Sequence, residues 1–402
     1  MPRGNKSSAH GSHPPNSMHL ARITHPRLLA VVGALTLLTP RSRAENSVSY
    51  KFADYQEMGG RIGVQTQGAY IEQDLGTDMH LKVAGILDSI AGATPTGEPA
   101  AAGSADVPLS NLHEYRKAWN ADLARQFSRV NIAVGVGNSR ESDYVSTGWS
   151  LNAVTDFNQK NTTLLTGVAG TDDTIKVFFQ PVPVKKRTND LIVGVTQLLD
   201  PRTSVSANIS WGRQRGQISD PYKLVQKSVE IFPGLFLPLS FGENRPQYRE
   251  KWIAFTSVNR AVPAANGALE ASYRFYRDTF GTNSNTLEVS WFQRVGEKLI
   301  LRPSLRFYDQ SAADFYSYDL NRTPVIPQSG VPNPGGPFYS SDFRLSALRA
   351  TTYGFKAVWK LASAAQLDAA WEWYEMRGKD SGTPSSAYPR ARVLTLGAKF
   401  SW

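Results

Sequence analysis

The sequence contains no cysteine in 402 residues, which excludes disulfide frameworks, thiolate metal sites and cysteine nucleophiles. Histidine is scarce too. Beyond residue 44 only His80 and His113 remain, so a multi-histidine metal site is not expected. Long apolar runs are missing after residue 44, and we therefore expect no membrane-spanning helix in that part of the chain. Together these absences predict a protein without a metal or other cofactor.

A strong net charge is also missing once the first residues are set aside. The formal net charge is +10, but residues 1–44 hold six basic residues and no acidic one. The remainder carries 38 basic and 34 acidic residues, an excess too small to predict a basic nucleic-acid-binding surface. Aromatic residues are frequent, with 9 Trp, 16 Tyr and 18 Phe, which argues against a disordered chain. We expect no nucleic-acid partner.

The first residues have the pattern of a secretory signal peptide. Leu28–Leu38 is an uninterrupted apolar run that follows two arginines and precedes small residues at the −3 and −1 positions of a cut after Ala44. A membrane anchor is the alternative, but it would need about 20 apolar residues. We predict a signal peptide over 1–44, with Met18 as a possible true start, and one mature domain over 45–402.

The mature chain alternates with the two-residue period of a strand, and hardly any segment keeps a helical period. In one example Val205, Ala207 and Ile209 fall on one face, while serines and an asparagine occupy the other. The pattern predicts sixteen strands, with fourteen or eighteen as the error range. Their expected ranges are 47–57, 61–73, 78–90, 116–126, 129–138, 143–157, 161–170, 188–199, 203–215, 247–260, 267–278, 284–294, 298–309, 345–361, 366–376 and 391–402.

Alternation alone does not separate a soluble sandwich from a membrane barrel, but the lengths of the connections do. Every second connection is short, and all the long ones lie between, at 91–115, 171–187, 216–246, 310–344 and 377–390. Short turns at one rim and long loops at the other are typical of outer-membrane barrels. We therefore predict an all-β fold, a transmembrane antiparallel β-barrel with short periplasmic turns and long extracellular loops.

The end of the chain adds a second indication of a barrel. The last strand places alternate apolar residues on one face and stops at an aromatic residue, which resembles the closure signal of Gram-negative barrels. In lipid every backbone group needs a partner, so the last strand is expected to pair with the first. The expected partners are outer-membrane lipid and the barrel-assembly machinery. The residues of this closure signal are Leu394, Leu396, Ala398, Phe400 and Trp402.

Several segments resemble a family of Gram-negative outer-membrane β-barrel proteins that is catalogued as a domain of unknown function. The resemblance implies the fold and an outer-membrane location, reached by export through the periplasm, and it brings no substrate or catalytic residue. The loop 91–115 departs from the family beyond its first residues. The matching segments are Asp88–Pro95, Asp156–Leu164, Gly194–Gln197, Asp220–Val225, Glu243–Pro246 and Gln310–Tyr316.

The faces opposite the apolar ones should line a lumen, and the later strands place many charges there. Such charges either order polar solutes at a constriction or form ion pairs that rigidify the wall, and the sequence leaves both interpretations open. Arg274, Arg302 and Arg306 are the best candidates for contact with an anion, because guanidinium groups suit carboxylate and phosphate. The charged positions are Glu270, Arg274, Glu288, Arg294, Arg302, Arg306, Lys356, Lys360, Asp368 and Glu372.

Two loops and one proline carry further expectations. Residues 231–242 are too apolar for free exposure, so they should fold into the lumen, lie in the outer leaflet or meet a partner. The five prolines of 323–337 favour extended backbone and a lid or recognition loop. Pro303 lies inside a predicted strand and cannot donate to the ladder, so a bulge is expected there.

These observations favour a passive channel for small polar or anionic solutes. The alternative is a plugged barrel that serves as anchor, assembly factor or sheath for another envelope protein. No enzymatic activity is expected, because His80 should lie near a short turn and His113 in a long loop, and neither has a visible catalytic partner set.

Overall fold

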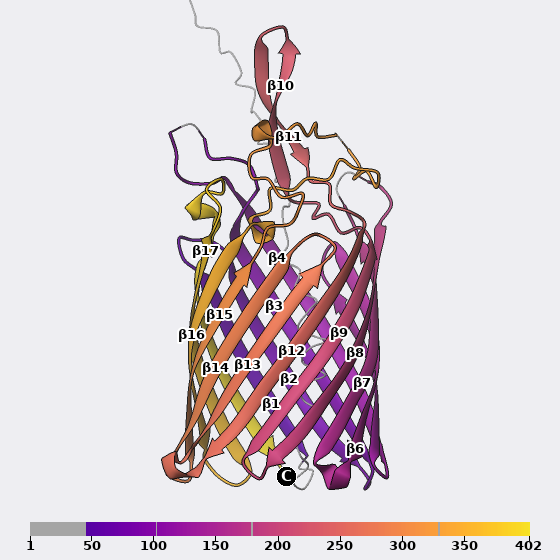
Figure 1. The fold of residues 1–402 in the computed structure, drawn as a ribbon, viewed down its shortest axis with the longest axis vertical. Coiled ribbons are helices and arrows are strands. Elements are labelled where there is room, and N and C mark those ends of the chain that lie inside the picture. The colour runs from indigo at the N-terminus through magenta and orange to yellow at the C-terminus, as the bar shows by residue number, and fades with distance from the viewer. Residues whose placement is uncertain (1–45, 102, 178–179, 329) are drawn as a thin grey trace, which may run out of the picture.

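The computed structural model describes residues 46–101, 103–177, 180–328 and 330–402. Sixteen antiparallel strands form a closed barrel (Figure 1), as the sequence predicted. The predicted signal peptide lies outside the described residues. The barrel strands are β1 (Ser47–Glu57), β2 (Gly63–Leu75), β3 (Met79–Pro95), β4 (Leu109–Phe127), β5 (Val130–Arg140), β6 (Tyr144–Phe157), β7 (Thr162–Ile175), β8 (Val184–Asp200), β9 (Thr203–Gly216), β12 (Tyr248–Val262), β13 (Gly267–Asp278), β14 (Asn283–Val295), β15 (Leu299–Gln310), β16 (Leu348–Lys360), β17 (Ala365–Gly378) and β18 (Arg390–Ser401).

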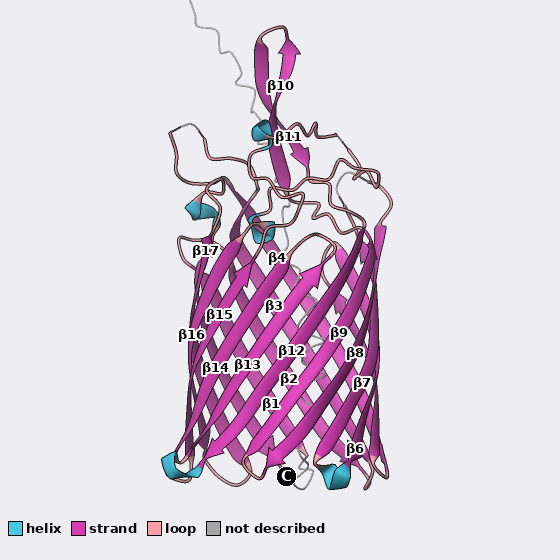
Figure 2. Ribbon diagram, viewed as in Figure 1, coloured by secondary structure: helices cyan, strands magenta, loops and turns pink. Residues whose placement is uncertain are grey.

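Elements outside the barrel wall are few (Figure 2). A separate two-stranded sheet joins β10 (Leu224–Phe232) and β11 (Leu235–Gly242) within the connection between β9 and β12. No helix among the described residues is long and apolar enough to span a membrane. The helical turns in those residues are the short 3₁₀ segments η2 (Asn158–Lys160), η3 (Pro263–Ala265), η4 (Leu320–Arg322), η5 (Phe343–Leu345) and η6 (Ser385–Ala387).

The two ends of the barrel differ in their connections. One end, here called the turn rim, carries the short connections, together with the start of β1 and the end of β18. The other end, the loop rim, carries the long connections, which lie at 96–108, 217–247, 311–347 and 379–389. The predicted sorting of short and long connections is thus present in the structure, but the connection expected at 171–187 is only 176–183, because β7 and β8 are longer than predicted.

Alternating side chains give the wall two chemically different faces. On β18 Leu394, Leu396 and Phe400 are exposed on the outer face, while Thr395 and Lys399 lie on the inner face and are half-buried. The same alternation places large exposed apolar side chains on the outer face of the other wall strands. The outer wall therefore presents an apolar surface all round.

Pairing between β1 and β18 closes the ring. It runs without a break from Ser47 opposite Ser401 to Glu57 opposite Ala391. The residues of the predicted closure signal face the outer side chains of β1, since Phe400 lies opposite Val48. Trp402 follows the strand and donates its backbone N–H to the carbonyl of Asn46 at 2.9 Å. Its ring stacks on Phe400, with 6.2 Å between the centroids.

The structure corrects two expectations about the strands. The loop predicted over 91–115 is shorter, because β3 and β4 pair as far as Pro95 and Leu109. Ala91, Gly92 and Ala93 show no apolar alternation, which is why the sequence did not predict a strand there. The bulge expected at Pro303 is absent: the pairing with β14 is interrupted beside Pro303, but its register is the same on both sides of the gap.

We predict that Leu396→Arg destabilises the barrel in lipid bilayers by about 2–4 kcal/mol, because it places a charge on the apolar outer face at mid-strand. Thr395→Arg is the matched control, since the same charge then faces the inner side. Equilibrium refolding into phospholipid vesicles measures both free energies. Equal effects of the two substitutions would contradict the assignment of the faces.

Candidate functional site

All ten charged positions expected to line a lumen lie on the inner face of the wall. They occupy β13, β14, β15, β16 and β17, on the side opposite the exposed apolar residues. Leu348 identifies the inner face of β16, because it packs in one buried cluster with Val107 and Tyr318 of the loops over the loop rim. Lys356 and Lys360 lie on the same face as Leu348 by alternation. Whether these charges line an open path stays a prediction.

Some of these charges form pairs across neighbouring strands. Arg302 lies 3.7 Å from Glu288 and also donates to the hydroxyl of Ser290 at 3.1 Å. Lys356 lies 3.3 Å from Asp368. The interpretation in which ion pairs rigidify the wall therefore fits these four residues.

Arg306 and Glu372 behave differently from those pairs. Both side chains are exposed although they face inward, and neither forms an ion pair with any residue that the structure describes. An exposed inward charge needs water beside it, because an unpaired charge without water is costly to bury. Arg294 and Lys360 are exposed in the same way, but they lie at the turn-rim ends of β14 and β16. Arg306 and Glu372 are therefore the charges within the wall that a passing solute would contact.

Charges on neighbouring parts of the inner wall were missed by the sequence analysis, which considered only β13 to β17. Glu72 on β2 lies 3.3 Å from Lys82 on β3 and 4.0 Å from Lys399 on β18. On another side Asp190 of β8 lies 2.8 Å from Lys251 of β12. The signal that could have found them is the alternation itself, since each of the five is next to at least one apolar outer residue.

The long connections meet over the mouth of the barrel at the loop rim and form what we call the lid, which consists of the described residues of 96–108, 217–247, 311–347 and 379–389. Loops from opposite walls are in direct contact. Thr96 accepts a backbone hydrogen bond from Leu224, the hydroxyl of Tyr318 donates to the carbonyl of Glu98, and Ser386 donates to the carbonyl of Ala105. Because these contacts cross between distant strands of the ring, the lid covers the mouth.

A buried ion network holds two of these loops together. Arg245 lies 2.6 Å from Glu243 and 2.8 Å from Asp342. Arg344 lies 2.6 Å from Asp342 and 2.9 Å from Asp220. The loop 217–247 thus contributes Asp220 and residues 243–245, and the loop 311–347 contributes residues 342–344, to one set of carboxylate and guanidinium groups.

Lys223 completes the network as its sixth charge. It is 2% exposed, and its ammonium group donates to the carbonyl of Pro95 at the end of β3. With Lys223 the network holds three basic and three acidic groups, so its formal charges balance. Balance matters here because a buried charge without a partner costs several kcal/mol.

The network shifts the pKa values of its members in opposite directions. Burial raises the pKa of Glu243 to about 7, against the attraction of Arg245. Burial would also raise the pKa of Asp342, but the guanidinium groups of Arg344 and Arg245 outweigh it and hold that pKa well below its usual range. Burial lowers the pKa of Lys223, and the charge of Arg344 adds to this.

Four members of the network come from segments that the sequence analysis had used only for the family resemblance. Asp220 and Lys223 belong to Asp220–Val225, and Glu243 and Arg245 to Glu243–Pro246. The sequence gives no sign that these short segments meet residues 342–344, about a hundred positions away. Only the fold brings them together.

The apolar segment 231–242 does not fold into the lumen, so that option of the prediction is wrong. It forms the tip of β10 and all of β11 and stands away from the barrel beyond the loop rim (Figure 1). Phe232 and Phe236 are 66% and 57% exposed. The hairpin forms because two runs of strand-forming residues flank a Pro233–Gly234 turn, and it leaves its apolar side chains in the open.

The two histidines beyond residue 44 both lie on strands. His113 lies in β4 and not in a loop, which corrects the prediction, and its ring meets the edge of Tyr115. His80 lies beside the turn rim, 2.7 Å from Asp74. The described residues contain no group of three or more histidines and carboxylates that could hold a metal ion.

Comparison with known families identifies the chain. The family model described as "Protein of unknown function (DUF3570)" matches residues 28–185 and 183–388. The chain belongs to this family. The resemblance inferred from the sequence is thereby confirmed, and DUF3570 brings a fold without an assigned role. No curated protein matches the DUF3570 chain significantly.

Solved structures with similar folds are distant in sequence. A bacterial polysaccharide outer-membrane secretin is 9% identical, with 90% of this chain and 100% of that chain covered and a TM-score of 0.48. OmpT of Vibrio cholerae, described as an outer-membrane protein, is 9% identical, with 90% and 99% covered and a TM-score of 0.43. The siderophore receptor PirA from Pseudomonas aeruginosa is 9% identical with a TM-score of 0.43, and this chain spans 62% of its length.

We predict that Arg245→Ala opens the lid of this DUF3570 protein, because it leaves Glu243 and Asp342 buried with one partner fewer, at a cost of about 3–5 kcal/mol. Hydrogen exchange of residues 217–247 and 311–347 should accelerate, while exchange in the wall strands stays unchanged. Arg322→Ala is the control, since Arg322 is a lid residue whose ion pair with Asp319 is exposed. Similar acceleration in both variants would argue against the network.

The lid should also loosen as pH rises from 5 to 8.5. In the closed lid Glu243 keeps its proton up to about pH 7, whereas an exposed glutamate loses it near pH 4.5. The contribution of this raised pKa to closure is therefore complete below about pH 4.5 and is lost as pH rises through 7, by roughly 3 kcal/mol at most.

Exchange rates of the lid, corrected for intrinsic pH dependence, measure this trend. Lys223 opposes it because its pKa is lowered, so the difference between the protein and Glu243→Gln isolates the carboxyl. A pH profile that is the same with and without Glu243 would count against the assignment.

Proposed function

We propose that this protein spans the outer membrane and passes small polar or anionic solutes passively through its lumen, with the lid as the gate of the extracellular mouth. The proposed role is not enzymatic. Outer-membrane lipid is the expected surrounding, and the barrel-assembly machinery the expected route of insertion.

The apolar outer wall supports the location. Trp119, Trp252, Tyr353 and Phe400 are each about half exposed on the outer face of different parts of the ring. Water would be a poor solvent for a continuous apolar surface of this kind, whereas lipid would cover it. A closed ring also leaves no unpaired strand edge, which is the condition for crossing a bilayer with strands.

The observation that carries the channel proposal is the pair of exposed inward charges, Arg306 and Glu372, in a barrel of sixteen strands. Barrels of this strand number are wide enough to hold water. A plugged interior would pair or bury these charges with the wall residues around them. The neighbouring pairs Arg302–Glu288 and Lys356–Asp368 would then set the shape of the path beside them.

The lid supports a gated path and argues against a permanently open pore. Its loops cross the mouth and share the buried ion network, so a solute of more than a few atoms would need the lid to open. Two of the six charges, Arg344 and Asp220, remain partly accessible at its edge. An arriving anion could compete for Arg344 there.

The exposed hairpin favours a second candidate function, an anchor or sheath for another envelope protein. Its tip exposes three large apolar side chains side by side in the sequence around the turn, Phe232, Leu235 and Phe236, and exposed apolar patches of this kind mark interaction sites. This candidate predicts a barrel that never conducts, together with an envelope protein that co-purifies only while the hairpin is present.

Planar-bilayer recording tests the channel. We expect ion currents from the purified barrel and longer open times for Arg245→Ala. We expect Arg306→Glu to shift the reversal potential in a KCl gradient towards cation preference, because it replaces the inward positive charge. Arg125→Glu is the matched control, since it makes the same charge change on the outer face at the turn rim. Absence of current from both the intact barrel and Arg245→Ala would overturn the proposal.

A further inference from the structure

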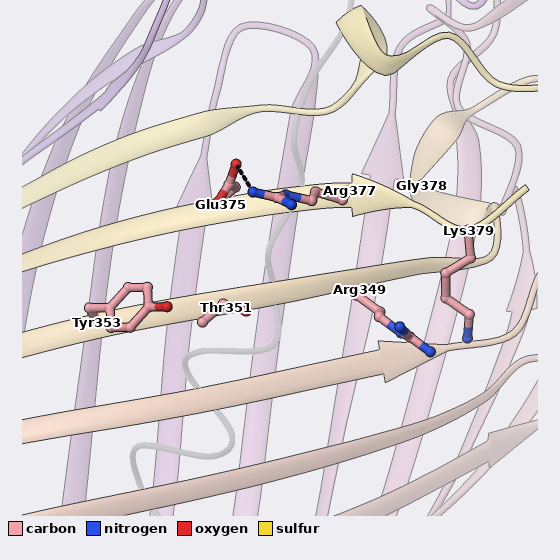
Figure 3. Close-up of a pocket in the computed structure, with 7 residues that line it drawn as sticks. All are labelled: Arg349, Thr351, Tyr353, Glu375, Arg377, Gly378 and Lys379. Atoms are coloured by element: carbon pink, nitrogen blue, oxygen red, sulfur yellow. Dashed lines mark hydrogen bonds and ion pairs between the residues drawn. The ribbon is translucent and has the colours of Figure 1, made fainter.

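A groove of about 660 Å³ lies on the outer face of β16 and β17 where these strands reach the loop rim (Figure 3). Arg349, Arg377 and Lys379 line it together with Glu375 and Tyr353. Alternation places Arg349 and Arg377 on the same outer face as the exposed Tyr353, so the groove faces away from the lumen. It takes no part in the proposed path for solutes.

On the strands around the groove the outer side chains change from apolar near the turn rim to charged at the loop rim, and on β17 two tryptophans lie between. On β17 Leu367 and Ala369 come first, then Trp371 and Trp373, and last Glu375 and Arg377. On β18 Phe400, Ala398, Leu396 and Leu394 are followed by Arg392 and Arg390. Aromatic side chains favour the interface between hydrocarbon and headgroups. The arginines therefore lie at the height of the headgroups.

The groove has more positive than negative charge. Asp309 is shared between Arg349 at 2.8 Å and Lys379 at 2.7 Å. Glu375 is likewise shared between Arg377 at 3.0 Å and Arg390 at 3.7 Å. Two carboxylates thus serve four cations, and the guanidinium groups of Arg349, Arg377 and Arg390 are 65–75% exposed. Each guanidinium has donors left for a further acceptor.

Arg349 and Arg377 are also directly opposite each other in the register of β16 and β17. Like charges at such positions repel, because the two residues are only about 5 Å apart at the backbone. The same arrangement recurs on the outer face near the loop rim, with Arg187 opposite Arg215. A third pair, Lys117 opposite Arg140, lies beside a smaller groove that Arg140 lines. An anion between the paired cations would remove the repulsion.

We infer that the groove at Arg349 and Arg377 binds a phosphate group of an anionic lipid in the outer leaflet. Guanidinium groups recognise phosphate by paired hydrogen bonds, and Tyr353 and Trp373 below them would contact the start of the acyl region. The inference rests on the proposed membrane location. A lipid phosphate fits the groove better than a free anion, because the cations lie directly above an apolar and aromatic surface that acyl chains would cover.

The test measures binding of diphosphoryl lipid A to the purified barrel in a phosphate-free, uncharged detergent, by native mass spectrometry. We expect Arg349→Gln combined with Arg377→Gln to weaken binding at least tenfold, and dephosphorylated lipid A to bind the unchanged barrel equally weakly. Arg125→Gln combined with Arg260→Gln is the matched control, because it removes two cations from the outer wall at the turn rim; binding should stay within twofold.

Thermal unfolding in the same detergent separates binding from a structural role. Without lipid the double variant should unfold at about the same temperature as the unchanged barrel, because the repulsion that it loses offsets the two exposed ion pairs with Asp309 and Glu375. The rise in Tm on adding lipid A should disappear. Arg349→Lys combined with Arg377→Lys should keep only part of the affinity, because lysine keeps the positive charge but lacks the paired donors of arginine.

Three results would overturn the inference: undiminished binding by the double glutamine variant, equal weakening by the turn-rim control, or inorganic phosphate that competes at concentrations equal to those of the lipid. The last would assign the groove to free anions. Failure of the membrane proposal is seen separately, as a barrel that stays monomeric in buffer without detergent.

Discussion

Every wall strand has two hydrogen-bonded neighbours because β1 pairs with β18 along its whole length. Away from the gap beside Pro303 and the ends of the strands, the backbone N–H and C=O groups of the wall thereby find partners within the protein, so the outer side chains are free to be apolar. The wall can therefore have an apolar outer face and a polar inner face, and this division decides where charged side chains lie. Charges are tolerated inside, where Arg306 and Glu372 have room, and at the rims, where Arg349 and Arg377 reach past the aromatic side chains.

The loop rim shows how charge is handled in two different surroundings. In the lid six groups from distant segments balance one another, because there is little water to share the cost of burial. On the outer wall the cations outnumber the carboxylates and stay exposed, because solvent or lipid phosphate can supply the remaining partners. Burial in the lid therefore raises the pKa of Glu243, whereas the arginines at the groove stay exposed.

Strand alternation and the lengths of the connections were enough to predict the strand number, the closure and the inner position of residues such as Glu288 and Lys356. They were not enough for the lid, because Asp220, Glu243 and Asp342 meet through loops without any period. The option that the segment 231–242 folds into the lumen was wrong for a related reason. Apolar loop residues suggested burial, but two strands joined by a tight turn can satisfy their own backbone and stand free. Pro303 was also misjudged, since a strand can skip a hydrogen bond without changing register.

The sharing of Asp342 between Arg245 and Arg344 has a mechanical consequence. Neither arginine can leave without exposing the carboxylate that also binds the other. The two loops that carry Arg245 and Arg344 should therefore open together. If the lid opens as proposed, it should open as one unit, and a current through the mouth beneath it would then jump between discrete levels instead of drifting smoothly.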